Sequence, residues 1–320
     1  MKLLVSWMES LGRYISREFH YTMQDLVRVH GWRHLEPWVL SPHAESPRAR
    51  IVELLGEVPE TILFWETYDL FNAIQPALRL LGCRLGIFAD DLHLLWGDEE
   101  SARDARLRAF FGCDNILTSY AYVLDEFYPE LRNRKPATWI PHSASPDFVL
   151  PFNDRPENAI LLSGFIGSLY PLRMRMKELQ QEGRYAIVRH EHPGYGEDYD
   201  YENDARVGRG YASTIHRFRA GFTDALTYRY VVAKHFEIPA TGALLVADGL
   251  VSQPLRQLGF VENVHYVPVS AENLEERIRY VLAKGNRAEI DEIRRRGQQL
   301  VLGAHRTRDR AKLIDSTYTA

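Results

Sequence analysis

The chain has 320 residues, about twice the length of a typical single domain, which favours two domains or one large domain. Hydrophobic residues make up 45% of the sequence and charged residues 26%, which excludes collagen-like and disordered chains. The formal net charge of −4 excludes a global positive field for nucleic acid or a membrane surface, although a local basic patch stays open.

Cysteine usage and the first residues indicate the compartment. The sequence contains 2 cysteines, Cys83 and Cys113, without a CxxC motif, a zinc spacing or a disulfide framework. The apolar run in the opening segment MKLLVSWMESLGR is too short for a signal peptide or a membrane-spanning helix. We therefore expect a cytoplasmic protein, with peripheral membrane association as an open alternative.

The first half of the chain alternates short β-like runs with helical stretches, a pattern typical of parallel βαβ units. Fully apolar or alternating runs predict strands over residues 2–7, 61–65, 84–89, 115–118 and 138–140. Apolar residues at helical spacing predict helices over residues 15–30, 69–81 and 102–111.

A proline-rich segment beginning at Pro141, PHSASPDFVLPFNDRP, then interrupts the pattern as an interdomain connection would. We place a first domain at residues 1–150 and a second at 151–320, with a terminal helix that can return to the first. Beyond the connection, the pattern predicts strands over 159–164, 185–189, 220–224 and 243–247. It predicts helices over 171–182, 271–283 and 287–302.

The segment KHFEIPATGALLVAD, from Lys234 to Asp248, carries the densest chemistry. Glu237 can accept hydrogen bonds from two ribose hydroxyls, and Lys234, three residues earlier on the same helical face, can meet a phosphate. The alternative is an ordinary exposed ion pair on a helix that precedes a strand.

Here the chain resembles the GT-B glycosyltransferases, specifically the CgeB-like branch and its relatives of the glycosyl transferases group 1 type. The branch has a motif R/K-x-F-E-I-P-A-x-G, matched by Lys234, Phe236, Glu237, Ile238, Pro239, Ala240 and Gly242. The segment LLSGFIGSLYPLR (161–173) and the closing RRRG and AHRTRDRAKLI segments are also similar to the family. The resemblance covers about residues 139–314, and it implies two Rossmann-like domains facing each other across a cleft.

The resemblance also implies roles for particular residues. A nucleoside diphosphate sugar, with a UDP-sugar as the expected donor, would be held by the second domain and the acceptor by the first. Glu237 would bind the ribose, the Thr241–Gly242 turn would approach the diphosphate, and Lys234 and Arg173 would neutralise the leaving group. No prosthetic group is implied.

One departure from the family concerns the donor sugar. Many related enzymes carry a second Glu eight residues before the one that binds ribose, and this chain has Arg229 there. Other groups must then orient the sugar, so its identity stays open.

Candidates for proton transfer come from the predicted strand ends of the first domain. Glu66, Asp90, Asp91 and His142 each follow an expected strand and could act as a general base. The alternative for the aspartate pair is N-capping of a helix at LHLLW. Gly12, after the first strand, would let the backbone approach the diphosphate.

His190 and His192 alternate in RHEHPGYG and could share one face, a spacing that also suits a metal, although we assign no metal site. Two other functions fit the same architecture, namely a sugar-nucleotide epimerase or hydrolase, and a non-catalytic nucleotide-sugar-binding protein. The acceptor stays open among a glycan, a lipid-linked glycan, a protein, a small molecule and a nucleic acid.

Overall fold

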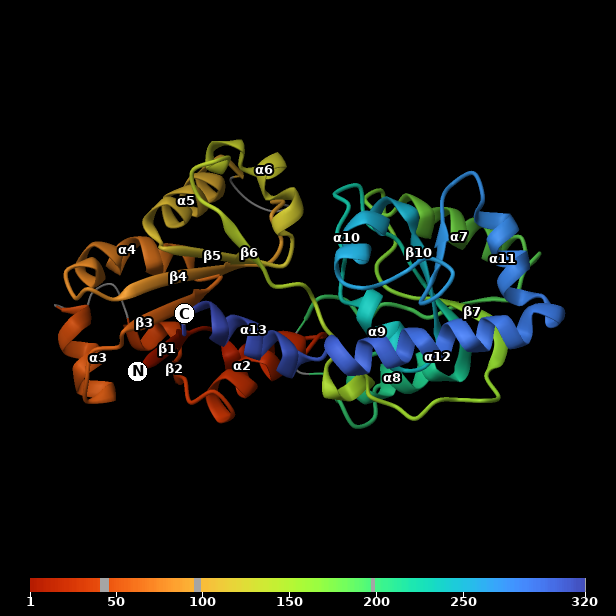
Figure 1. The fold of residues 1–320 in the computed structure, drawn as a ribbon, viewed down its shortest axis with the longest axis horizontal. Coiled ribbons are helices and arrows are strands. Elements are labelled where there is room, and N and C mark those ends of the chain that lie inside the picture. The colour runs from red at the N-terminus through yellow and green to blue at the C-terminus, as the bar shows by residue number, and fades with distance from the viewer. Residues whose placement is uncertain (41–45, 95–98, 197–198, 320) are drawn as a thin grey trace. The chain divides into compact units, whose positions relative to one another are not determined.

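The computed structural model describes residues 1–40, 46–94, 99–196 and 199–319 (Figure 1). The chain divides into two compact units. The first unit contains residues 1–11, 22–141 and 310–320, and the second contains 12–21 and 142–309. The units change over between Pro141 and His142, inside the proline-rich connection, and the expected acceptor and donor roles of the two halves stay a prediction.

The first unit is built on a six-stranded parallel sheet with the order β2-β1-β3-β4-β5-β6. Its central strands β3 (Thr61–Trp65) and β4 (Arg84–Ala89) are almost entirely buried, as apolar strands covered on both faces are. The flanking strands are β1 (Lys2–Val5), β2 (Arg33–Leu35), β5 (Asn115–Thr118) and β6 (Ala137–Trp139).

Helices connect the parallel strands of this sheet. The longer ones are α2 (Glu18–Arg28), α3 (Pro47–Leu55), α4 (Tyr68–Arg79) and α5 (Glu99–Gly112). Two short helices are α1 (Met8–Leu11) and α6 (Leu124–Phe127). α4 and α5 pack against each other, and α2 has its first turn in the second unit and its remainder in the first (Figure 1).

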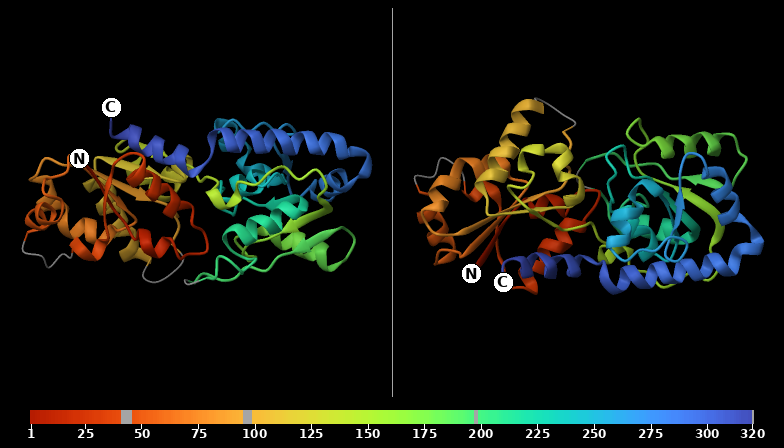
Figure 2. Two further views of the ribbon diagram at one scale, coloured as in Figure 1. Left: turned by 90° about the horizontal axis from the view of Figure 1, so that it is seen from below. Right: turned by 45° about the horizontal axis from the view of Figure 1, so that its top comes forward.

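The last helix, α13 (Thr307–Thr317), brings the C-terminal residues to the first unit (Figures 1 and 2). Asp315 accepts hydrogen bonds from Lys2 Nζ and Trp32 Nε1, both at 2.7 Å. The buried ring of Tyr318 occupies the space in front of Gly86 on β4, where any Cβ would collide with its hydroxyl. The glycine therefore makes room for a residue more than two hundred positions later in the chain.

The second unit has a five-stranded parallel sheet with the order β11-β10-β9-β7-β8. The strands are β7 (Glu157–Leu162), β8 (Ile187–Arg189), β9 (Phe218–Thr223), β10 (Leu244–Asp248) and β11 (Val267–Val269). The helices are α7 (Pro171–Gln181), α8 (Gly208–Arg217), α9 (Lys234–Ala240), α10 (Ser252–Gln257), α11 (Leu274–Leu282) and α12 (Arg287–Ala304). One face of the sheet packs its aliphatic side chains against α7, α11 and α12.

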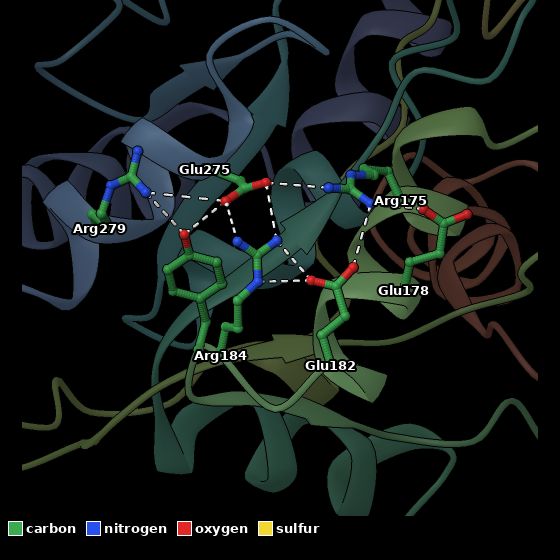
Figure 3. Close-up of polar contacts among 7 residues, drawn as sticks. Arg175, Glu178, Glu182, Arg184, Glu275 and Arg279 are labelled. Atoms are coloured by element: carbon green, nitrogen blue, oxygen red, sulfur yellow. Dashed lines mark hydrogen bonds and ion pairs between the residues drawn. The ribbon is translucent and has the colours of Figure 1, made fainter.

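An exposed ion network joins α7 to α11 on the second unit (Figure 3). The Glu275 carboxylate accepts from Arg175 Nη2 at 3.1 Å and from the Tyr185 hydroxyl at 2.8 Å, and Arg184 Nη1 lies 3.3 Å away. Because these side chains are open to water, the network is screened by salt and its worth is small.

The expected fold class is confirmed, since both units are parallel α/β sheets of the Rossmann type. The predictions for β3, β4 and β5 are correct to the residue, and the other expected strands and helices are present with shifted ends. The sequence pattern did not predict the three-residue edge strands β2 and β11 or the helices α3 and α8. The LHLLW helix is absent over residues 92–94, and Leu95 and Trp96 lie outside the described residues.

Candidate functional site

The second unit places Glu237 inside the protein on the short helix α9. The residue is 6% exposed, and no described residue donates a hydrogen bond to its carboxylate. Burial raises the pKa of Glu237, the positive charge of Lys234 acts in the opposite direction, and the charge of Glu18 raises it further. A buried carboxyl without a donor from the described protein can accept hydrogen bonds from a ligand.

The turn after β7 brings a glycine against two cations from distant parts of the chain. Gly164 has φ +93°, and a Cβ there would lie 2.9 Å from Arg173 Nη1 and 3.0 Å from Lys234 Cε. Only glycine fits both this conformation and this space. The turn therefore exposes backbone beside two positive charges at the carboxyl edge of the sheet, where phosphate groups bind in such folds.

Arg173 is 3% exposed and has fixed partners within the same unit. Its Nη1 donates to the Phe165 carbonyl at 3.0 Å and its Nη2 to Thr223 Oγ1 at 3.1 Å. Its Nε lies 3.4 Å from the Asp224 carboxylate, which also accepts the Arg173 backbone N–H. Burial raises the pKa of Asp224, and the Arg173 charge opposes that shift. The guanidinium is thus held rigidly over the Gly164 turn.

A cavity of about 460 Å³ opens beside this turn, at the carboxyl ends of β7 and β8. It is lined by Gly164, Phe165, Ile166, Lys177, Arg189, Glu191, His192, Gly194 and Tyr195. The half-exposed ring of Phe165 and the ring of Tyr195 lie 6.5 Å apart. Burial, together with the charges of Lys234 and Arg173, lowers the pKa of His192 to about 4, so this ring is neutral at pH 7.

His142 does not stand alone, because a carboxylate from the beginning of the chain holds it. The Glu18 Oε2 atom lies 2.8 Å from His142 Nδ1, and Glu18 Oε1 accepts the Ser143 N–H and hydroxyl at 2.5 and 2.9 Å. Both Glu18 and His142 are buried, and Phe19 stacks on the imidazole. Glu18 therefore fixes the orientation of the ring and shares the electrostatic surroundings of Glu237.

Arg17 anchors the same N-terminal segment. Its guanidinium makes a bidentate pair with Asp147, with Nη2 to Oδ2 at 2.7 Å, and lies 4.0 Å above the Tyr201 ring. The Tyr201 hydroxyl donates to the Tyr14 carbonyl. Gly12 lies in the turn just before this segment, which belongs to the second unit.

The structure does not bring Thr241 and Gly242 to the group around Lys234. The Thr241 hydroxyl donates back to the Ile238 carbonyl at 2.7 Å. Gly242 has φ +82°, and Gln298 from α12 and Phe152 fill the space beside it. These two residues serve the turn into the amino end of β10, and we leave them out of the donor site proposed below.

Asp90 and Asp91 lie in the first unit at the carboxyl end of β4. The Asp90 N–H donates to Glu66 Oε1 at 3.2 Å, and Arg106 Nη1 donates to the Asp91 carbonyl at 2.5 Å. Burial of the carboxyl, with the Asp90 charge adding to it, raises the pKa of Glu66 to about 8. His93 Nδ1 lies 3.9 Å from Asp91 Oδ1. Glu66, an expected candidate, thus has a strongly raised proton affinity at this edge.

His190 and His192 do not form part of a metal cluster in the described structure. His190 stacks on the Tyr211 ring at 5.6 Å, and His192 Nδ1 accepts the Gly194 N–H at 3.0 Å. Within residues 1–40, 46–94, 99–196 and 199–319, no three His, Cys, Asp or Glu side chains gather to hold a metal ion. In the same ranges, no helix combines the length and apolar character needed to cross a bilayer.

Residues 174–316 match the model of a family described as glycosyl transferase-like. This part of the chain is therefore similar to that family. It includes Lys234 and Glu237, whereas Gly164 and Arg173 lie just before it. A search among curated proteins finds no match.

Solved structures share the fold over the whole chain. Sucrose-phosphate synthase from Thermosynechococcus elongatus is 12% identical with a TM-score of 0.63, covering 99% of this chain and 98% of that one. HepE from Anabaena, in complex with UDP and glucose, is 8% identical with a TM-score of 0.64, covering 99% of both chains. A trehalose-6-phosphate synthase is 11% identical with a TM-score of 0.60, covering 99% and 98%. The fold is GT-B, and the CgeB-like branch stays a prediction.

Proposed function

We propose that this protein is a glycosyltransferase that moves a sugar from a nucleoside diphosphate sugar, with a UDP-sugar as donor, to a hydroxyl group. The observation that carries the proposal is the meeting of Gly164, Arg173 and Lys234 beside the buried Glu237. The glycosyl transferase-like match over residues 174–316 supports it independently.

The diphosphate would lie on the Gly164 turn. Lys234 Nζ provides a mobile positive charge, and the buried guanidinium of Arg173 a fixed one, so the leaving group gains charge beside preorganised cations. Catalysis needs this stabilisation because negative charge grows on the diphosphate as the bond to the sugar breaks.

The ribose of the nucleoside would bind Glu237, and the base would lie in the cavity beside Gly164. Two vicinal ribose hydroxyls would supply the hydrogen bonds that no described residue donates to the Glu237 carboxylate. A base would fit in the 460 Å³ cavity, against the rings of Phe165 and Tyr195. Uracil is the favoured base, since HepE, which has this fold, has been solved with UDP and with UDP-glucose.

Proton transfer from the acceptor falls to Asp90, Asp91 or His142 in this proposal. Of these, His142 is oriented by Glu18, and Asp90 is paired through its backbone with Glu66. A cytoplasmic location, inferred from the two cysteines, completes the proposal, and both thiols are buried and free.

Calorimetric titration with UDP, GDP, ADP, CMP and TDP tests the donor class. We expect one nucleotide to bind selectively and Glu237→Gln to weaken that binding about tenfold or more, the worth of one hydrogen bond to a charged group. Glu276→Gln, an exposed glutamate on α11, is the matched control and should bind as the unaltered protein does. Equal affinity in both variants would remove Glu237 from the site.

Turnover assays separate the competing functions. A hydrolase or epimerase would consume the donor sugar nucleotide at its full rate without acceptor, whereas a transferase would need one. Nucleotide binding without turnover of any donor, in the presence of a broad acceptor panel, would favour a non-catalytic binding protein.

A further inference from the structure

One wall of the 460 Å³ cavity in the second unit comes from a long connection without regular secondary structure. The connection runs from the end of β8 to the start of α8, and the structure describes residues 190–196 and 199–207 of it. Four of its residues line the cavity, namely Glu191, His192, Gly194 and Tyr195. Because the described part of the connection contains neither helix nor strand, other contacts must fix the shape of this wall.

The Tyr199 side chain ties the wall together. Its hydroxyl donates to the Gly194 carbonyl and accepts the Gly196 N–H, both at 2.9 Å. The Gly194 N–H donates in turn to His192 Nδ1 at 3.0 Å, and the His192 and Tyr195 rings lie 4.7 Å apart. The position of Tyr199 therefore sets the position of the backbone and of the rings that line the cavity.

Arg17, from the N-terminal segment of the same unit, holds the neighbouring Tyr201. Its Cζ lies 4.0 Å from the centre of the Tyr201 ring, and that ring makes an edge contact with the Tyr199 ring at 6.4 Å. A Cβ on Gly208 would come within 3.1 Å of Tyr201 Cδ1 and 3.2 Å of Arg17 Nη2, so these groups are closely packed. Asp147 accepts from Arg17 Nε at 3.2 Å and from Nη2 at 2.7 Å. A guanidinium held in this bidentate way presents a fixed planar face to an aromatic ring.

We propose that Arg17 is a positioning residue for nucleoside binding. By holding Tyr201 and, through its ring, Tyr199, it fixes the wall of the cavity against which the base would lie. Arg17 is not among the residues that line the cavity, so it acts through the two tyrosines and not on the ligand. The inference rests on the proposed function, which places the base in this cavity. It concerns the nucleoside alone, because Arg173, which would meet the diphosphate, is held by other partners.

Calorimetric titration of the full chain with UDP and with pyrophosphate tests the inference, because pyrophosphate lacks the nucleoside. Arg17→Met removes the ion pair and the planar group, and Tyr199→Phe removes only the bridging hydroxyl. The matched controls are Arg256→Met, an exposed arginine on α10, and Tyr185→Phe, whose hydroxyl belongs to the exposed ion network.

We expect UDP affinity to fall about fivefold in each of the two variants, the worth of one neutral hydrogen bond, and pyrophosphate affinity not to change. A wall that is ordered before binding lowers the ordering cost of binding, so its loss appears only in the affinity for the nucleoside part. The double variant should bind UDP no more weakly than the more affected single variant, since both changes act on one wall. The two control variants should bind both ligands as the unaltered protein does.

Three outcomes would overturn the inference: unchanged UDP affinity in Arg17→Met, equal losses of UDP and pyrophosphate affinity, or fully additive losses in the double variant. Equal losses would show that Arg17 supports the second unit as a whole. Should Arg17→Met fail to fold, Arg17→Lys takes its place in the same comparison, since it keeps a charge beside Asp147 but presents no planar face to Tyr201. Unaltered protein that does not bind UDP would overturn the proposed function instead, so the two failures are distinguishable.

Discussion

The two units share one architecture but differ in what they place at the carboxyl edge of their sheets. In the second unit, Lys234 and Arg173 flank a glycine turn, which suits a diphosphate. In the first unit, the Asp90 N–H donates to the Glu66 carboxylate, so this edge carries carboxyl groups instead. Because both sheets are parallel and covered by helices, the backbone alone does not distinguish the edges. The few residues just beyond the strands therefore distinguish the two edges.

Gly164→Ala should have the largest effect on nucleotide binding at the carboxyl edge of the second unit, where Arg173 and Lys234 lie. The new Cβ would meet Arg173 Nη1 and Lys234 Cε, and alanine at φ +93° adds strain of about 1 to 2 kcal/mol. We expect nucleotide affinity, measured by calorimetry, to fall well over tenfold. Gly183→Ala is the matched control, since it has φ +67° with no atom within 4 Å. A similar loss in both variants would mean that strain alone, and not the crowding of the cations, disables the site.

Lys234→Met should come next, because it removes the mobile charge and keeps most of the side chain's volume. If the ammonium stabilises charge on the leaving diphosphate, kcat should fall about 10- to 100-fold and KM should change little, the range of a charged hydrogen bond. Steady-state kinetics with a UDP-sugar measures both, and Lys284→Met, an exposed lysine, is the control. A rise in KM at constant kcat would instead indicate uniform binding of the ground state.

Glu66→Gln tests the carboxyl edge of the first unit through the pH dependence of folding stability. The folded pKa of about 8 exceeds the ordinary value of 4.5, so the folded protein binds this proton more tightly than the unfolded chain does. Stability should therefore fall as the pH rises from about 4.5 to about 8, and level off above that range. Because Glu66 is partly open to solvent, screening of its charge makes this decrease in stability with pH smaller.

The glutamine variant should lack this dependence in urea denaturation at pH 5, 7 and 9, while Glu57→Gln, an exposed control in the same unit, should retain it. Identical pH profiles for Glu66→Gln and the unaltered protein would assign the proton to another group.

Glu275→Gln should have the smallest effect, since it removes only the ion network between α7 and α11, which contains none of the candidate site residues (Figure 3). A slight decrease in melting temperature at low salt should disappear at high salt, and nucleotide affinity should not change. Glu276→Gln, the neighbouring exposed glutamate, is the control for thermal denaturation. A change in nucleotide affinity would connect this surface with the site.

Local pattern predicted the buried strands of both sheets and missed one edge strand of each, β2 and β11. β3 and β4 are continuous apolar runs, so their limits are visible in the sequence. β2 has three residues and an exposed arginine, and neither length nor alternation distinguishes it from a loop.

The placement of Lys234 and Glu237 on one helix, α9, was predictable from their spacing. The partnership of His142 with Glu18 joins residues 124 positions apart, and no periodicity reveals it. Two glycines illustrate the same limit, because tertiary contacts place Gly164 beside cations and Gly242 beneath α12. Sequence alone offered Gly242, and not Gly164, as a candidate for close approach to a ligand.

The return of α13 to the first unit has a consequence for how the chain is made. Residues 310–320 belong to the unit that begins at Met1, and Tyr318 fills the space in front of Gly86. During synthesis on a ribosome, the first sheet is translated early, yet the residues that complete its packing emerge after the whole second unit. The first unit must therefore wait in an unfinished state, with the surface around Gly86 uncovered, until the late helix arrives.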